Sequence, residues 1–295
     1  MNVIGLGQCG CNVAKCFEQY PQYKIYYINT EKIESKEYLF PEQEYYTSKE
    51  NVNIGKTFLI PEQESHESYE DNAPDLSKFL KGVKGRTLFF IGGGGVISGV
   101  SLRVLEKLKA RYVDVFYIRP DISLLSEKKK LIDRAVYNVL QEYSRSGALG
   151  NFHVIDNPLI ESYIPDITIM NRWEKINHHI SSTVHMINVY QNQVPVLNNL
   201  DFFSENSRLR TIGLFDVENN SEKLLFNLEN VKEKCYYYAI PEKRLREDTD
   251  LLKMITEQVK EKTESGEIKV FHAVYPTQYE YPICYVLATS SEIQK

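Results

Sequence analysis

Four consecutive glycines between an apolar strand and a helical pattern constrain this chain more than any other feature. Residues 88–91 are a continuous apolar run that predicts a buried strand. Residues 92–95 are all glycine, Ser98 and Gly99 follow, and residues 100–108 have apolar side chains at helical spacing. The backbone N–H groups of such a loop, together with the N-terminus of the next helix, can bind an anion. We therefore expect a phosphate-binding loop here rather than a simple tight turn.

A second glycine-rich segment opens the chain. Residues 1–4 predict a short strand that runs directly into Gly5-Leu6-Gly7-Gln8-Cys9-Gly10. The Gly-x-Gly-x-x-Gly spacing between a strand and a helix is the dinucleotide fingerprint, and Glu31 lies about 20 residues further on, where a ribose contact is expected. An NAD(P)-dependent oxidoreductase is therefore one alternative. Such an enzyme does not need a second phosphate loop, however, and two loops favour a nucleotide whose polyphosphate is held from both sides.

Composition limits the other possibilities. The 295 residues suffice for one large or two moderate domains, with 42% hydrophobic and 25% charged residues. A net charge of −5 argues against a nucleic-acid partner. No apolar run approaches the roughly 20 residues that span a membrane. The N-terminus does not resemble a secretion signal, so we expect a cytoplasmic protein with its five cysteines reduced.

Strands and helices alternate through the first half of the chain. Further strands are predicted at 24–28, 112–118 and 152–155, and each ends in a polar or glycine-rich loop. This alternation predicts a doubly wound, mostly parallel α/β sheet with its ligand at the carboxyl ends of the strands. Residues 32–80 allow no assignment beyond loops at 51–55 and 70–72. A strong amphipathic helix follows Pro120, with apolar side chains at 3–4 spacing, namely Leu131, Ile132, Ala135, Val136, Val139, Leu140 and Tyr143.

The pattern changes after residue 170. A long helix is predicted from about 172 to 193, where Pro195 stops it, and a short helix is expected after residues 199–201. The remainder predicts a smaller α+β half, with strands near 211–217, 235–240, 268–275 and 283–288 and a helix near 248–262. We accordingly expect a nucleotide-binding domain over 1–171, a connecting helix over 172–195 and an α+β domain over 196–295.

The two glycine loops together resemble those of the tubulin/FtsZ superfamily of GTP-dependent filament proteins. Residues 7–12, Gly-Gln-Cys-Gly-Cys-Asn, are similar to the tubulin phosphate loop Gly-Gln-Cys-Gly-Asn. Residues 93–99 are similar to the signature Gly-Gly-Gly-Thr-Gly-Thr/Ser-Gly, but Val96 and Ile97 replace its Thr and inner Gly. These two changes remove a hydroxyl donor and add bulk where the backbone normally approaches phosphate closely.

The resemblance implies a set of nucleotide contacts. Asn29 follows the second strand, Glu127 lies near the ribose-contacting Glu of the FtsZ branch, and Asn157 corresponds to an Asn that hydrogen-bonds guanine. Trp173 and Asn177, four residues apart on the long helix, match a ring that stacks on the base and an amide that pairs with its edge; a plain core role for Trp173 is the alternative. The implied nucleotide-binding residues are Gly7, Gln8, Cys9, Gly10, Asn12, Asn29, Gly92, Gly93, Gly94, Gly95, Ser98, Gly99, Glu127, Asn157, Trp173 and Asn177.

Residues 199–205, Asn-Leu-Asp-Phe-Phe-Ser-Glu, resemble the family segment that reaches the γ-phosphate of the next subunit. In the family, its carboxylates orient the attacking water and help place a cation. The resemblance implies catalytic roles for Asn199, Asp201 and Glu205. Glu205 would replace the second acid of FtsZ, because Ser204 occupies that position. The alternative is a helix N-cap at Asp201 followed by an ordinary surface Glu205.

The resemblance implies a GTPase that polymerises head-to-tail with copies of itself, binds GTP or GDP with Mg²⁺ and serves an unidentified adaptor or cargo. The short length and the altered second loop make the chain more similar to a divergent phage, plasmid or bacterial member of the superfamily than to a eukaryotic tubulin or a cell-division FtsZ. A nucleotide-binding protein of this type without hydrolysis is a further alternative. No resident metal site is predicted, since Cys9 and Cys11 have no second ligand pair and the neighbouring His178 and His179 cannot both face one metal. No hydrolase triad accompanies Ser98.

Overall fold

The computed structural model describes residues 1–33, 54–108, 112–201, 203–264 and 266–295. The chain forms two compact units, Met1–Ser181 and Ser182–Lys295, and the division falls inside the long helix α7, Arg172–Gln191. The three-part division expected from the sequence, 1–171, 172–195 and 196–295, stays a prediction. Most of the expected loop at 51–55 lies outside the described residues.

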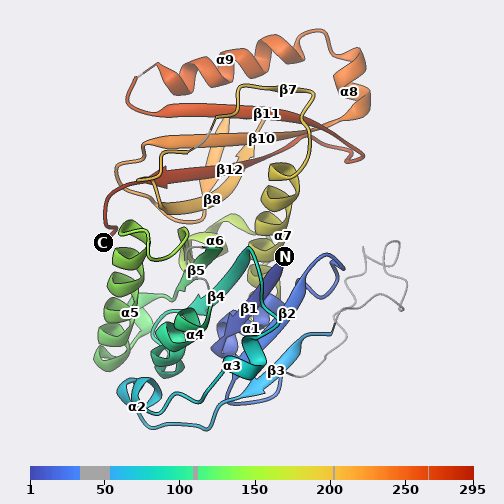
Figure 1. Cartoon of the computed structure of the whole chain (residues 1–295). Helices are drawn as coiled ribbons and strands as arrows, with labels where there is room; N and C mark the ends of the chain where they lie inside the picture. The colour runs from blue at the N-terminus through green and yellow to red at the C-terminus, as the bar shows by residue number, and fades with distance from the viewer. Residues whose placement is uncertain (34–53, 109–111, 202, 265) are drawn as a thin grey trace. The chain divides into compact units, whose positions relative to one another are not determined.

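The described part of unit 1 contains a six-stranded parallel sheet (Figure 1). Its spatial order is β3-β2-β1-β4-β5-β6, with every neighbouring pair parallel. The expected strands are confirmed to within two residues. The one strand not anticipated, β3, is short and mostly exposed at the sheet edge, and therefore has no apolar run. The strands are β1 (Asn2–Leu6), β2 (Lys24–Asn29), β3 (Lys56–Leu59), β4 (Thr87–Gly92), β5 (Val113–Arg119) and β6 (Phe152–Asp156).

Helices connect these strands in the doubly wound manner. The described helices of this unit are α1 (Gly7–Lys15), α2 (His66–Asp71), α3 (Ser77–Leu80), α4 (Ser101–Lys107), α5 (Glu127–Arg145), α6 (Asn157–Tyr163) and α7, with 3₁₀ turns η3 (Val96–Val100) and η5 (Ile122–Leu124). The loop expected at 70–72 is wrong, because Glu70 and Asp71 form the end of α2, whose N-terminus is capped by the Ser65 hydroxyl. In the described segments, no helix is long and apolar enough to cross a membrane.

Aromatic side chains tie the central strands together. Phe90 of β4 stacks on Phe116 of β5 with ring centroids 4.9 Å apart, and Phe116 stacks on His153 of β6 at 4.3 Å. These residues occupy paired positions in the parallel ladder. Such stacks add to the burial energy of the rings and fix the register of the strands that carry the loops.

Helix α5 forms where the sequence predicts it, but its apolar residues do not share one buried face. Ile132, Val136 and Leu140 are buried against the sheet. The remaining four apolar residues are exposed, with 67% of Leu131, 39% of Val139 and 43% of Tyr143 accessible to solvent, and Ala135 exposed as well. The buried face also takes in Asp133, Tyr137, Gln141 and Ser144. Spacing alone did not reveal that this polar row faces inward.

Unit 2 is built on a second, mixed sheet. Its order is β8-β12-β10-β11-β7, and β9 also pairs with β8; β10 and β11 are parallel and the other pairs of this unit antiparallel. The expected strands and helix are confirmed as β8 (Leu209–Asp216), β10 (Glu233–Pro241), β11 (Lys269–Thr277), β12 (Ile283–Ser290) and α9 (Leu251–Thr263), and the sequence did not indicate β7 (Leu197–Asn198), β9 (Ser221–Leu224) or α8 (Glu242–Glu247).

The short helix expected after residues 199–201 is absent from the described residues 203–208, which form a turn at 205–206 and are otherwise irregular. The backbone N–H of Ser204 donates to both carboxylate oxygens of Glu233 on β10, at 3.1 and 3.0 Å. This bond holds the segment against the sheet, so an N-cap role for Asp201 has no helix to serve.

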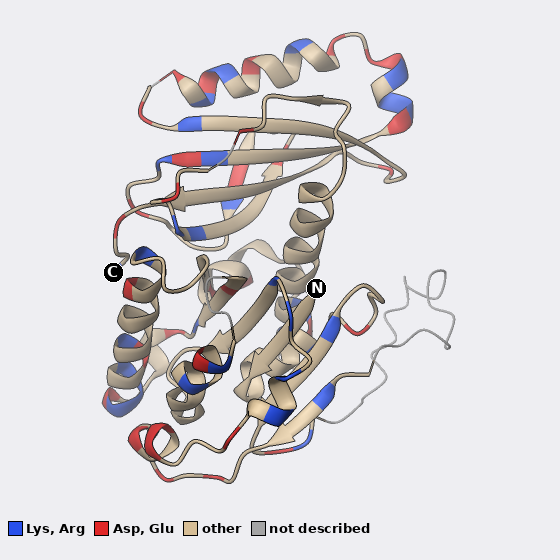
Figure 2. Cartoon of the chain, viewed as in Figure 1, with Lys and Arg blue, Asp and Glu red and all other residues tan. Residues whose placement is uncertain are grey.

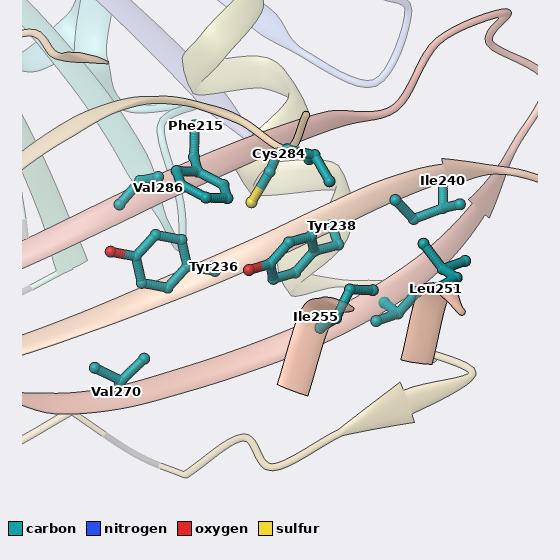
Figure 3. Close-up of a cluster of buried hydrophobic side chains, with 11 residues drawn as sticks. Phe215, Tyr236, Tyr238, Ile240, Leu251, Ile255, Val270, Cys284 and Val286 are labelled. Atoms are coloured by element: carbon teal, nitrogen blue, oxygen red, sulfur yellow. The ribbon is translucent and has the colours of Figure 1, made fainter. Parts of the chain in front are cut away.

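Buried tyrosines dominate the core between α9 and this sheet (Figure 3). Tyr236 and Tyr238 are fully buried and pack around Phe215, and their hydroxyls donate to Glu222 at 2.6 Å and to Gln258 at 3.4 Å. Because a buried hydroxyl without a partner is costly, these bonds allow tyrosine to serve as a core residue. Ile255 and Leu251 of α9 close the cluster.

Truncation of Ile255 tests this core. We expect Ile255→Ala to lower the free energy of unfolding by about 2–5 kcal/mol, because the substitution leaves a cavity under α9. Leu252→Ala on the same helix is the matched control, since Leu252 is 60% exposed and should cost under about 1 kcal/mol. Urea unfolding followed by tyrosine fluorescence measures both; equal losses would contradict the packing described.

Candidate nucleotide-binding site

The two glycine loops meet where the strand order of unit 1 reverses. β1 pairs with β2 on one side and with β4 on the other, with Leu6 opposite both Ile28 and Ile91. Connections from β1 lead toward one edge of the sheet and those from β4 toward the other. Such a reversal leaves a crevice at the carboxyl ends of the two central strands, where ligands bind in open α/β sheets.

The first loop is the N-terminus of α1 itself. β1 passes into the helix without a connecting residue, and Gly7, the first helical residue, has φ +68°, a conformation that favours glycine. Leu6 caps the helix without a side-chain hydrogen bond, and the first turn has no acidic residue. The N–H groups of this turn therefore have neither an intrahelical acceptor nor a capping side chain, and they carry the positive end of the helix dipole.

The second loop runs from the end of β4 into η3. The Ser98 N–H and hydroxyl both donate to the Gly95 carbonyl, at 3.0 and 2.6 Å, and Ser98 is only 1% exposed. The Ser98 hydroxyl thus closes the turn rather than facing outward. Gly95, by contrast, is open, with nothing within 4 Å of the position that a Cβ atom would occupy. The helix expected directly after the glycines begins as this 3₁₀ turn and becomes α-helical at Ser101.

The loops touch each other and the strand ends. A Cβ atom on Gly7 would lie 2.7 Å from Cγ2 of Ile97, and one on Gly92 would lie 2.7 Å from Cβ of Cys9. The close approach of α1 to β4 depends on Gly10, where a Cβ atom would lie 2.2 Å from the Phe90 carbonyl oxygen. The two loops therefore form one site, and the Ile97 side chain lies directly over the start of α1.

Three polar side chains line the first loop. Asn29, at the end of β2, donates to the Gln8 side-chain oxygen at 3.3 Å, and Gln8 donates to Asn12 at 2.9 Å. Asn29 is buried and Gln8 exposed, so the chain of bonds leads from the sheet to the surface. Cys9 lies half-buried between the loops, and burial raises the pKa of its thiol to about 12, which keeps it protonated and neutral.

The side-chain oxygen of Asn157 is the atom that says most about a ligand of this site. Asn157 follows β6 as the first residue of α6 and is only 6% exposed. Its side-chain oxygen is buried without a hydrogen-bond partner among the described residues. A buried acceptor without a donor is rare, because it costs about 1–3 kcal/mol. An N–H donor of a ligand would satisfy it.

The remaining predicted contacts lie on α5 and α7. Glu127 is exposed and accepts a hydrogen bond from Lys130 at 2.8 Å, which lowers the pKa of its carboxyl. Trp173 is 53% exposed and therefore not a core residue, and the Arg172 guanidinium lies 4.6 Å from its ring centroid. Asn177 is half-buried, one helical turn further on.

The predicted catalytic segment belongs to unit 2. The Asn199 side-chain oxygen accepts from the His272 N–H of β11 at 2.6 Å, and the Asn199 N–H donates to the His272 carbonyl at 3.0 Å. Asp201 is exposed and forms an ion pair with Lys269 at 3.1 Å, and Glu205 is exposed. Asn199 thus anchors the segment to β11, while both carboxylates remain accessible.

Two neighbours of the second loop were not found from the sequence. A Cβ atom on Gly93 would lie 2.1 Å from the Asp133 carboxylate, which accepts a hydrogen bond from the Tyr117 hydroxyl at 2.7 Å. Burial raises the pKa of both groups. The His66 carbonyl similarly abuts Gly99. No spacing in the sequence predicts either contact. Asp133 has the pattern of an acid on a helix surface, and His66 lies in residues 32–80, to which the sequence assigns no element. The described residues contain no cluster of three or more metal-ligating side chains.

This geometry defines the class: an α/β protein with two glycine-rich loops in contact at the topological switch point of its sheet. Comparison with models of protein families finds no match, and neither does comparison with characterised protein sequences. Solved structures do match. An FtsZ dimer from M. jannaschii superposes with a TM-score of 0.66 at 14% identity, over 98% of this chain and 87% of that one.

Two further solved structures have the same architecture. GDP-form protofilaments of TubZ from Bacillus thuringiensis serovar israelensis match with a TM-score of 0.66 at 17% identity, over 98% of this chain and 86% of that one. A GTPγS-bound protofilament of CetZ2 from Haloferax volcanii matches at 0.64 and 13% identity, over 98% and 92%. The chain therefore has the tubulin/FtsZ fold over nearly its whole length, as the sequence resemblance implied.

Substitution of Gly7 tests the contact between the loops. Gly7→Ala should destabilise the protein by about 1–3 kcal/mol, because alanine is strained at φ +68° and its methyl group would meet Ile97. Gly95→Ala is the matched control, since that position is open and its φ is −82°. Adding Ile97→Ala should recover part of the loss at Gly7. Thermal unfolding without nucleotide measures all three, and no recovery would contradict the proximity of Ile97.

Proposed function

We propose that this chain binds a guanine nucleotide between its two glycine loops. The observation that carries the proposal is the direct contact of the loops at the uncapped N-terminus of α1, with the orphaned Asn157 oxygen near the carboxyl end of β6. The first site favours phosphate and the second favours an N–H donor. Guanine offers such donors on its pairing edge, whereas the corresponding ring nitrogen of adenine is an acceptor.

Each of the predicted nucleotide-binding residues then contacts the phosphates, the base or the ribose, or shapes a loop that does. The N–H groups of residues 7–10 and 92–95 hold the phosphates, with Gly99 and the Ser98 bond shaping the second loop. Gln8, Asn12 and Asn29 form the polar wall of the first loop. Asn157 and Asn177 bind the base edge, Trp173 supplies an exposed ring for stacking, and Glu127 contacts the ribose. Mg²⁺ accompanies a triphosphate because its charge must be neutralised, with phosphate oxygens and water as the main ligands.

We further propose that copies assemble head-to-tail into filaments. The similar TubZ and CetZ2 structures are protofilaments, and the FtsZ structure is a dimer. Apolar side chains that a monomer would bury are exposed on both units: Ile169, Met170 and Trp173 before and at the start of α7, and Val194, Val196 and Leu200 after it. Two different surfaces of this kind suit a heterologous contact, which repeats without closing.

Hydrolysis would be completed by the neighbouring copy. Asn199 fixes its segment to β11, so the exposed carboxylates of Asp201 and Glu205 are presented on a rigid support. From an adjacent subunit, these groups can orient a water and accept its proton at the phosphate end of the site. The cytoplasmic location and an adaptor or cargo remain predictions from the sequence.

Two alternatives have specific support. Ile97 covers the start of α1 and Ser204 replaces an acid, which favours a nucleotide-binding protein without hydrolysis. The strand order β3-β2-β1-β4-β5-β6 is shared with dinucleotide-binding folds, which keeps the NAD(P) oxidoreductase alternative open. Unit 2 and the match to filament proteins over 98% of the chain favour the GTP proposal.

Base recognition is tested at Asn157. Titration of the purified protein with GTP, ATP and NADH should show preference for GTP, and Asn157→Leu should weaken GTP binding about tenfold through loss of the acceptor. Asn157→Asp keeps an oxygen at that position and should retain the preference. Unfolding temperature without nucleotide should not fall in Asn157→Leu, since the lost oxygen has no partner. Preferential binding of NADH would reject the GTP proposal.

Shared catalysis is tested at Asp201. With GTP and Mg²⁺, phosphate release should rise more steeply than protein concentration, and Asp201→Ala should slow it about 100-fold while GTP binding is unchanged. Glu205→Ala should also slow release, whereas Glu280→Ala, which removes another exposed acid of unit 2, should not. Mixing Asp201→Ala protein with Asn157→Leu protein, which should bind GTP weakly but keeps the Asp201 carboxylate, should restore part of the activity. Tight GTP binding with no release in the parent protein would support the non-hydrolysing alternative.

A further inference from the structure

An apolar ridge on the solvent side of α5 has no role in the proposed nucleotide site. Leu131, Ala135, Val139 and Tyr143 are all exposed, and they follow one another at intervals of four residues. Residues at this spacing form a continuous row along one side of a helix, here about 18 Å long. The adjoining side of α5 is buried against its own sheet and includes Ile132, Val136 and Leu140. The exposed row continues this apolar stripe onto the solvent side, so the apolar surface of α5 is wider than the part that its own sheet covers.

We propose that this ridge is a homotypic contact, in which α5 packs antiparallel against α5 of a second copy. A two-fold axis near residue 137 would place Leu131 against Tyr143 of the second copy and Ala135 against its Val139. The small Ala135 next to the axis lets the helices approach, and rows of this kind interlock as ridges into grooves. A two-fold contact needs only one self-complementary surface, which the ridge supplies.

The charges beside the ridge favour this antiparallel arrangement. The first turns of α5 carry three consecutive lysines and Arg134 along with Glu127 and Asp133, and its last turns carry Glu142 and Arg145; the ribbon of Figure 2 is coloured by these charges. In the antiparallel pair, Arg134 would lie within about one turn of the second copy's Glu142, and Glu127 within about one turn of its Arg145. A parallel pair would instead set Arg134 against Arg134 and Glu142 against Glu142. Both acids already pair within α5, Glu127 with Lys130 and Glu142 with Arg145, so they are held at its surface.

The second copy is favoured over other occupants by this self-complementarity. The ridge involves few residues, and the area it can bury is below the roughly 1,200 Å² of a stable dimer. The contact is therefore weak between two isolated molecules. It becomes stronger between two rows of linked copies, because many α5–α5 contacts then form together. The inference does not depend on nucleotide binding, so it is testable without a polymer.

The test is cross-linking in nucleotide-free protein. Asn138, exposed and next to the proposed axis, is replaced by cysteine, and dimers are trapped with a short bis-maleimide over a range of protein concentrations. Lys253→Cys, on the exposed side of α9, is the control position, and the parent protein reports the background from the native cysteines. We expect dimer yield to rise with concentration for Asn138→Cys only.

Charge exchange then distinguishes pairing from chance collision. In the Asn138→Cys background, Arg134→Glu or Glu142→Arg alone should lower the cross-linking rate about threefold, because each sets like charges opposite each other. The double exchange should restore the rate, which a merely structural role of either residue would not do. Leu131→Glu should abolish it.

Yields equal to those of Lys253→Cys, or no rescue in the double variant, would overturn the proposal. Binding to vesicles of anionic phospholipid that Leu131→Glu abolishes, without self-cross-linking, would also overturn it and assign the ridge to a membrane surface. Failure of GTP binding or assembly would leave these outcomes unchanged, since none of the measurements uses nucleotide.

Discussion

The backbone contact between α1 and β4 is the constraint on which the candidate site depends. At Gly10 the helix lies so close to the strand that a Cβ atom would meet the Phe90 carbonyl oxygen at 2.2 Å. Any other residue would push α1 away from the sheet and separate its first turn from the loop after β4. The uncapped first turn of α1 and the glycine loop after β4 converge only because this approach is possible. The arrangement of the two glycine loops is thus a consequence of packing as much as of loop sequence.

Ile97 shows how a small change can alter such a site without altering the fold. Its side chain lies over Gly7 and occupies space between the two loops, and the related signature has a glycine in place of Ile97. Because the contact is apolar and Gly7 is buried, it also helps hold the loops together without a ligand. The same residue can therefore stabilise the empty protein and reduce the room for phosphate.

Unit 2 uses polar anchors where unit 1 uses close backbone packing. Asn199 is bound to β11 through His272, and Ser204 to β10 through Glu233, so the segment between them follows the sheet instead of forming a helix. The carboxylate of Asp201 is left exposed on this support, where it forms an ion pair with the exposed Lys269. An exposed ion pair of this kind contributes little stability.

Local apolar runs and fixed spacings along the chain were enough to predict most of the strands and longer helices, the two glycine loops and the family resemblance. Apolar runs predicted β1, β2, β4, β5 and β6 to within two residues, since each of these strands is mostly buried and continuous. Which residues meet across the fold became apparent from the folded chain alone. The contact of Ile97 with Gly7 and the Asp133–Tyr117 pair beside Gly93 join residues from different elements. The burial of the Asn157 oxygen without a partner likewise depends on the elements that surround it. Likewise, the periodicity of the sequence predicted that α5 is amphipathic. Its orientation on the sheet determines that Leu131 faces solvent and that Asp133 faces the interior. Burial depends on the neighbours that a helix packs against, and the spacing of its own residues does not specify them.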